Sequence, residues 1–217
     1  MGRTTDGLSY WQAETSDTPL LDVTIGDLLD RRAEELSTHE AVVYSCYPEF
    51  GGALDIRWTY RDYSTLASSV ARGLMTLGLN KGEHIAIWAA NLPEWLLLYM
   101  AAAKAGLVLV TINPVLRAQE VEYILKQGDV SALFFMGKVR DHDCLETMRS
   151  LTTPGAKHGE VTSERLPVLR YTCLVGAPLP GLLEQEEWRP TLFREMVADG
   201  MSVSEAAFKE RQASVVP

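Results

Sequence analysis

The sequence predicts an α/β fold in which a mostly parallel sheet is flanked by helices. Two observations carry this prediction. Between Lys81 and Phe134, short apolar runs alternate with segments of helical periodicity, which is the pattern of a βαβαβ unit. The composition, with 47% apolar and 23% charged residues, is typical of a globular domain with enough apolar side chains for a sizeable core.

The segment before this unit predicts two capped helices with a hairpin between them. Thr24 followed by Asp27 is typical of a helix start, and this helix should extend to about residue 36. Thr59 and Asp62 form a second capping pair, and apolar residues at helical spacing follow until Gly78 ends the helix. Strands are expected at 41–45 and 54–58, on either side of the turn-rich segment CYPEFGGA.

The elements of the central unit have clear boundary signals. Asn91 and Glu94 form a capping pair, and Pro93 lies in the first helical turn, where its missing N–H costs nothing. Gly106 ends this helix, which is apolar nearly all round and should therefore be covered on both faces. The expected strands are 84–90, 107–112 and 130–136, and the expected helices are 92–105 and 118–127.

The signal weakens after Gly137. A helix is expected at 141–151, and residues 152–167 have no apolar period and predict a long surface loop. A strand at 168–175 and helices at 192–198 and 204–212 follow, the last helix being capped by Ser202 or Ser204.

Charge and targeting signals exclude several classes of protein. The net charge is −9 and no run of Lys or Arg occurs, which argues against nucleic-acid binding. Three widely spaced cysteines, Cys46, Cys144 and Cys173, fit a reducing compartment better than a disulfide framework. No signal peptide, transit peptide or transmembrane segment is seen. We therefore expect a cytoplasmic protein, with a mitochondrial location as the alternative if the chain is eukaryotic.

Few residues have the spacing of a known catalytic, phosphate-binding or metal-binding motif. The spacing of Gly73 and Gly78 resembles a phosphate loop, but Leu79 stands where Lys is needed and Gly73 lies within a predicted helix. The cluster His142-Asp143-Cys144 lacks a second pair of ligands at metal-binding spacing, so a solvated helix start explains it better.

Two further groups of residues could have either a functional or a structural role. The acidic run of Glu184, Glu186 and Glu187 is better explained as a solvated face than as paired catalytic carboxylates. Asn91 and Trp95 follow a strand of a parallel sheet, which is where open α/β folds bind ligands. Helix capping by Asn91 and packing of Trp95 form the favoured interpretation.

Residues 58–135 carry a family resemblance. The segments WTYRDY, LGLNKGEHIAIWAANLPEW, AAAKAGLVLVTINPVLRAQEVEYIL and SALFF resemble acyl-CoA synthetases of the adenylate-forming (AMP-binding) superfamily. Within it, the chain is most similar to the medium-chain fatty-acid branch called acyl-CoA synthetase family member two, whose start the segments RTTDGLSYW and DVTIGDLLDRRAEE also resemble.

The resemblance implies an ATP-dependent acid–thiol ligase that uses ATP, Mg²⁺ and coenzyme A. It implies an N-terminal arm at 1–22 and an incomplete N-terminal AMP-binding domain at 23–217. The family's phosphate loop, T-S-G-T-T-G-x-P-K-G, would be expected shortly after Pro217. The resemblance assigns no catalytic, cofactor-binding or metal-binding residue in this sequence, because the family's motifs for those roles have no matching positions here. The substrate-binding residues are unknown.

The leading hypothesis is thus the N-terminal segment of a fatty-acid (medium-chain) acyl-CoA ligase that is inactive alone and binds no cofactor itself. The alternative is a non-catalytic binding or interaction module derived from such an enzyme. A self-sufficient doubly wound enzyme of unrelated function is disfavoured, because no catalytic constellation is found. Association through exposed apolar surface is expected, because further strands and helices cover this segment in the complete family domain.

Overall fold

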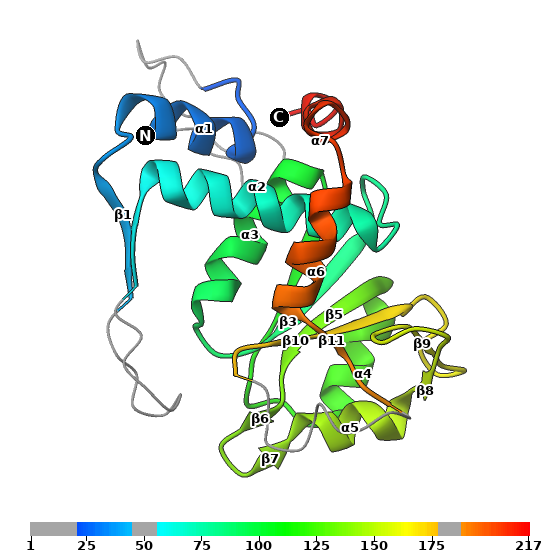
Figure 1. The fold of residues 1–217 in the computed structure, drawn as a ribbon. Helices are drawn as coiled ribbons and strands as arrows, with labels where there is room; N and C mark the ends of the chain where they lie inside the picture. Colours follow the sequence, from blue (N-terminus) through cyan, green and yellow to red (C-terminus); the bar gives the residue numbers. More distant parts are fainter. Residues whose placement is uncertain (1–20, 45–55, 178–187) are drawn as a thin grey trace, which may run out of the picture.

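A computed structural model of the chain describes residues 21–44, 56–177 and 188–217. Its centre is a five-stranded sheet in which every pair of neighbouring strands is parallel (Figure 1). The strand order is β11–β10–β5–β3–β4. The strands are β3 (His84–Trp88), β4 (Val108–Ile112), β5 (Val130–Met136), β10 (Tyr171–Val175) and β11 (Thr191–Leu192). The prediction of an α/β fold with a parallel sheet is confirmed.

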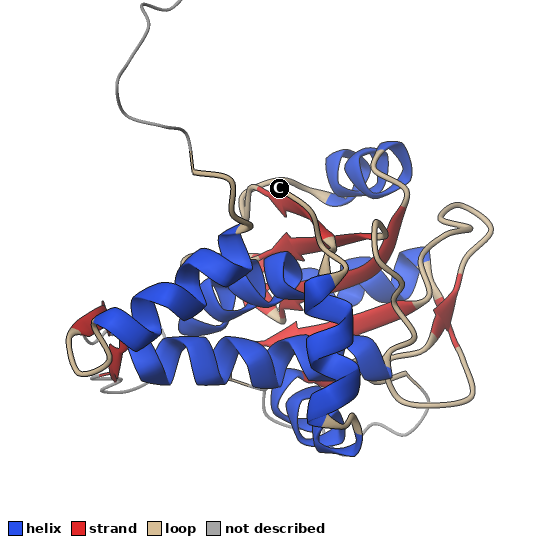
Figure 2. Cartoon of the chain, turned by 90° about the horizontal axis from the view of Figure 1, so that it is seen from above, coloured by secondary structure: helices blue, strands red, loops and turns tan. Residues whose placement is uncertain are grey.

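Helices cover both faces of this sheet, as Figure 2 shows from above. One face packs against α2 (Tyr60–Thr76), α3 (Pro93–Ala105) and α6 (Phe193–Asp199), and α1 (Ile25–Glu35) packs on α2 and α3. The other face packs against α4 (Ala118–Gln127) and α5 (Cys144–Leu151). The result is a three-layer arrangement, which is how a parallel sheet buries the apolar side chains of both its faces.

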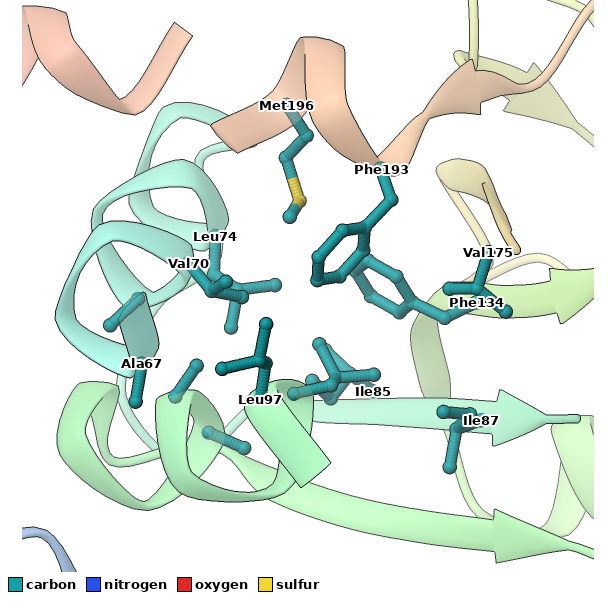
Figure 3. Close-up of a cluster of buried hydrophobic side chains, with 14 of the residues drawn as sticks. Ala67, Val70, Leu74, Ile85, Ile87, Leu97, Phe134, Val175, Phe193 and Met196 are labelled. Atoms are coloured by element: carbon teal, nitrogen blue, oxygen red, sulfur yellow. The ribbon is translucent and has the colours of Figure 1, made fainter. Parts of the chain in front are cut away.

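The two cores follow from the alternation of side chains along the strands. In β3, Ile85 and Ile87 face the α2–α3–α6 core, whereas Ala86 and Trp88 face the α4–α5 core. All seven residues of β5 are buried, as expected for a strand covered on both faces. Figure 3 shows the first core, which includes Ala67, Val70, Leu74, Ile85, Ile87, Leu97, Phe134, Val175, Phe193 and Met196.

The predicted N-terminal elements are confirmed where the structure describes them. Thr24 Oγ1 accepts a hydrogen bond from the Asp27 N–H at 3.1 Å, and Thr59 and Asp62 form a complete capping box. Strands β1 (Glu40–Tyr44) and β2 (Ile56–Thr59) pair antiparallel, as the hairpin prediction requires. Residues 1–20 of the predicted arm and the hairpin tip at 45–55 lie outside the described residues.

The predicted capping of α3 by Asn91 is wrong. The N-cap residue is Leu92, and no side chain caps this end. The cause is Pro93 at the first helical position, which forces the preceding residue into an extended conformation, with φ −112° and ψ 158° at Leu92. Leu92 thereby takes the N-cap position, and Asn91 lies one residue outside it.

Two predictions in the weaker C-terminal half also need correction. The helix expected at 141–151 begins only at Cys144, because a small hairpin of β6 (Lys138–Val139) and β7 (His142–Asp143) precedes it. This hairpin turns at Arg140, which has φ 54°. The strand expected at 168–175 begins at Tyr171.

The segment predicted as a surface loop at 152–167 is partly buried. It contains a hairpin of β8 (Thr153–Pro154) and β9 (Val161–Thr162). Val161 and Leu166 are only 5% and 2% exposed, because they pack into the α4–α5 core. Their irregular spacing is the reason why no apolar period was visible in the sequence.

The chain ends in α7 (Glu205–Ala213), close to the predicted helix at 204–212. Ser204 is its N-cap residue and accepts a hydrogen bond from the Ala207 N–H, whereas Ser202 lies in a preceding 3-10 turn. None of the helices within the described ranges is both long and apolar enough to cross a lipid bilayer.

Candidate functional site

The candidate site is the carboxyl edge of the parallel sheet, at its topological switch point. The chain passes from β3 to β4 on one side and then returns to β5 on the other side of β3. Open α/β sheets bind ligands outside the strand ends at such a reversal. The candidate ligand site therefore consists of the residues that directly follow β3 and β5, which are Ala89–Leu92 and Gly137.

Mostly apolar groups occupy this position. The Ala90 N–H donates to Met136 Sδ at 3.3 Å, and Leu92 is only 3% exposed. The chain after β10 lies close by, because a Cβ added to Gly176 would be 3.3 Å from Leu92 Cδ1. These groups can shape an apolar wall for a ligand, but they supply neither a nucleophile nor a proton carrier.

Asn91 is exposed at this edge and is not engaged as the helix cap. Trp95, one turn into α3, is half-buried and stacks on Tyr99 with ring centroids 5.9 Å apart. The structure thus keeps the packing role predicted for Trp95 and removes the capping role predicted for Asn91. The Asn91 amide is thus a polar group exposed at this edge.

Behind the edge lies Trp88, which is fully buried at the end of β3. Its indole N–H has no hydrogen-bond partner among the described residues. The ring centroid of His142 is 5.5 Å from that of Trp88, and His142 Nε2 lies 3.2 Å from Thr147 Oγ1. A buried donor without a partner is unfavourable, and one acceptor such as a water molecule would satisfy it.

The cluster His142-Asp143-Cys144 has structural roles. Asp143 Oδ1 accepts a hydrogen bond from the Glu146 N–H at 2.9 Å and so caps α5. Burial raises the pKa of the Cys144 thiol to about 12, so the thiol stays protonated and is a poor metal ligand. Within the described ranges, no group of three His, Cys, Asp or Glu side chains could hold a metal ion.

The other described candidates from the sequence, Gly73 and Cys173, have structural surroundings. Gly73 lies inside α2, where a Cβ would be 2.7 Å from the Met196 carbonyl oxygen, so this glycine serves close helix packing. Cys173 is buried, and burial raises the pKa of its thiol well above the usual value. The acidic run Glu184, Glu186 and Glu187 lies outside the described residues.

One polar cluster was missed by the sequence analysis. Lys104 is fully buried on α3 and forms an ion pair with Asp30 of α1, and its Nζ donates to Ser64 Oγ at 3.2 Å. Burial opposes ionisation of Asp30, yet hydrogen bonds from Lys104, Ser64 and Gln212 outweigh it and lower the pKa. The available signal was Lys104 near the end of a helix that is apolar apart from Glu94 in its first turn, because a lysine that is buried in such a helix needs a partner.

The parallel sheet, its strand order and the helices on both its faces define the chain as a doubly wound α/β protein. The particular family follows from comparison with known proteins. The chain belongs to the AMP-binding enzyme family, whose model matches residues 29–191.

Relatives with curated names are acyl-CoA ligases. The putative acyl-CoA synthetase YngI of Bacillus subtilis is 38% identical over 199 residues, covering 90% of this chain and 34% of the relative. The human mitochondrial medium-chain acyl-CoA ligase ACSF2 is 33% identical over 183 residues, covering 83% of this chain and 28% of the relative. The chain thus spans about a third of the length of the curated relatives it matches.

Solved structures show the same fold. A long-chain-fatty-acid-CoA ligase from Archaeoglobus fulgidus superposes with a TM-score of 0.65 at 16% identity, covering 88% of this chain and 32% of that chain. A long-chain-fatty-acid CoA ligase from Rhodopseudomonas palustris superposes with a TM-score of 0.58 at 23% identity, covering 81% of this chain and 36% of that chain.

Proposed function

We propose that this chain is the N-terminal segment of an acyl-CoA ligase that activates a fatty acid, with a medium-chain acid as substrate. The observation that carries the proposal is the family match over residues 29–191. This range includes four of the five strands of the sheet and the first residue of the fifth strand, β11. The names of the relatives from Bacillus subtilis and human support the reaction class. In this proposal residues 1–22 form an arm and residues 23–217 form part of the AMP-binding domain.

The reaction proposed for the complete enzyme has two steps. A carboxylate oxygen of the fatty acid attacks the α-phosphorus of ATP, the bond from that phosphorus to the bridging oxygen breaks, and pyrophosphate leaves; Mg²⁺ would supply positive charge to the phosphates. The coenzyme A thiol then attacks the acyl carbon of the adenylate, and AMP leaves. Both steps depend on electrostatic stabilisation of developing negative charge.

We further propose that the 217 residues do not catalyse this reaction alone and hold no cofactor themselves. The sequence contains no glycine-rich phosphate loop, and among the described residues Leu92 and Met136, which lie at the carboxyl edge, have no acid–base chemistry. What this segment contributes is a rigid sheet whose switch point, with Asn91 exposed beside it, can form one wall of a ligand site.

A chimera tests the proposed function. Residues 23–217 of this chain replace the matching segment of the human medium-chain relative, and octanoate-dependent ATP–pyrophosphate exchange is measured. We expect the chimera to retain exchange with octanoate. A chimera that folds cooperatively but shows no exchange would contradict the assignment to this enzyme class.

The isolated chain tests the proposed inactivity. We expect no pyrophosphate exchange with octanoate, and measurable exchange would overturn this part of the proposal. Calorimetric binding of octanoate, ATP or coenzyme A without exchange would instead support the second candidate, a non-catalytic binding module.

The compartment stays a prediction. The human relative is named as mitochondrial, whereas the Bacillus subtilis relative is bacterial. We propose a cytoplasmic location, with the mitochondrion as the alternative for a eukaryotic source. Fractionation of cells that express the tagged full-length protein distinguishes the two.

A further inference from the structure

Helix α7, like α1 and α4, buries few of its residues. Of its nine residues only Phe208 is buried, at 4% exposure. A helix of this length is not stable alone in water, so α7 depends on its contacts with the rest of the chain.

Most of these contacts are polar and involve the end of the helix. Gln212 Nε2 donates to Asp27 Oδ1 at 2.8 Å and to Asp30 Oδ2 at 2.7 Å. Arg211 donates to the carbonyl oxygens of Leu79 at 2.6 Å and Ala105 at 3.3 Å. Ala105 is the last residue of α3, so the guanidinium also meets the negative end of that helix dipole.

The Gln212 contact links α7 to the buried ion pair. Asp30 Oδ1 accepts hydrogen bonds from Lys104 and Ser64, and Asp30 Oδ2 accepts one from Gln212. Because Lys104 is fully buried, its ammonium group depends on the Asp30 carboxylate as counterion. Gln212 of α7 donates a hydrogen bond to the same carboxylate. The position of α7 is therefore coupled to the surroundings of this charge.

A groove of about 660 Å³ lies beside these contacts. Asp27 and Asp30 of α1, Ser64 of α2, and Phe208 and Gln212 of α7 line it. Since α7 forms one wall, its movement would widen the groove and increase the exposure of Asp30, whose side chain is already 37% exposed. Figure 1 shows α7 beside the end of α1, away from the sheet.

We propose that α7 is a detachable strap that undocks from α1 and α3 and withdraws Phe208 from the edge of the α2–α3–α6 core, while the sheet and the rest of both cores stay folded. Undocking widens the groove and increases the exposure of the Asp30–Lys104 pair to water. This conformational step is independent of the proposed ligase function, because it rests only on contacts within the described residues.

Hydrogen exchange and lysine labelling under native conditions test the strap. In the wild-type chain, the α7 amides should exchange at least about tenfold faster than those of β3 and β5, because local opening needs less free energy than global unfolding. Gln212→Glu adds a third carboxylate beside Asp27 and Asp30. It should speed α7 exchange by a further factor of about ten, since like charges repel, and leave β3 and β5 unchanged. The rate at which an amine-reactive ester acylates Lys104 should rise in parallel.

Two further variants keep the test decisive. Glu210→Gln changes an exposed side chain of the same helix and should alter neither rate. Arg211→Gln removes the contacts to Leu79 and Ala105 without adding charge, and it should speed α7 exchange even if Gln212→Glu fails to fold. Exchange of α7 at the same rate as β3 in the wild type, or acceleration of all elements together in the variants, would overturn the proposal.

Discussion

Lys104 is the residue whose environment is least expected from its type. It lies fully buried on an apolar helix, and its charge is balanced by Asp30, whose side chain is 37% exposed. A buried cation that loses its partner is costly, because the remaining charge has neither water nor a counterion. The partially exposed carboxylate, in contrast, can be solvated when the lysine is absent.

This asymmetry predicts an order of stabilities. Asp30→Ala should lower the free energy of unfolding by about 2–3 kcal/mol, which is less than a fully buried pair would lose because Asp30 is partly solvated. Lys104→Met removes the buried charge itself and should cost less. Glu34→Ala, an exposed acid on the same helix, should change stability by less than about 0.5 kcal/mol. Urea unfolding measures all three, and a larger loss for Lys104→Met than for Asp30→Ala would contradict the argument.

Glu83 gives a residue-scale prediction for pH. Burial opposes its ionisation, but hydrogen bonds from Arg170, the Asn80 backbone and Ser131 outweigh burial and lower the pKa of Glu83 from 4.5 to about 2. A group with a lowered folded-state pKa stabilises the fold above its unfolded-state pKa and loses that contribution as the pH falls through the folded-state value.

We therefore expect the wild-type chain to lose the stability that the Glu83 charge contributes as the pH falls from 4.5 to about 2. Glu83→Gln should be less stable than the wild type at pH 7, and the difference between them should shrink across this acidic window. Urea unfolding at a series of pH values measures it. A difference that is independent of pH would show that the charge of Glu83 does not matter.

At the scale of elements, α2 and α6 approach one another through two glycines. A Cβ on Gly73 would lie 2.7 Å from the Met196 carbonyl oxygen, and one on Gly200 would lie 2.6 Å from the Gly73 nitrogen. Both obstacles are backbone atoms, which cannot rotate away as a side chain can.

Gly73→Ala should consequently destabilise the chain by about 1–3 kcal/mol through overpacking, although alanine gains about 1 kcal/mol in helix propensity. Thr65→Ala at an exposed position of α2 serves as the propensity control and should be neutral or slightly stabilising. Thermal unfolding of both variants measures the difference. Equal stabilisation by both substitutions would mean that the helices separate at little cost.

The elements also show what could be predicted from sequence. The capping pair Thr59–Asp62 and the stop at Gly78 located α2 closely, because these signals are local. The start of α3 was misplaced because Pro93 restricts Leu92 and thereby displaces Asn91 from the cap. The start of α5 was misplaced because the β6–β7 hairpin before it has only two residues per strand. The Asp30–Lys104 pair could not be predicted, because it joins helices 74 residues apart in sequence.

At the scale of the whole molecule, the sheet has an edge at β4 that no described strand covers. The strand Val108–Ile112 carries no charged residue, proline or glycine, which are the usual protections of an exposed edge. Exposed apolar side chains lie on β4 and on the segment that follows it: Val108 is 46%, Val115 48% and Tyr123 67% exposed. This surface fits the expectation that the chain associates through apolar contacts.

Association at this edge has a measurable signature. Sedimentation velocity should show species larger than the monomer, and added salt should increase them, because it screens the repulsion of a net charge of −9. Thr111→Lys places a charge at an exposed position of β4 and should shift the distribution to monomer. Thr162→Lys, at an exposed position of the distant β9, should leave the distribution largely unchanged. A wild-type chain that stays monomeric at high concentration and high salt would show that the β4 edge is protected by its own side chains, because an unprotected apolar edge pairs when repulsion is screened.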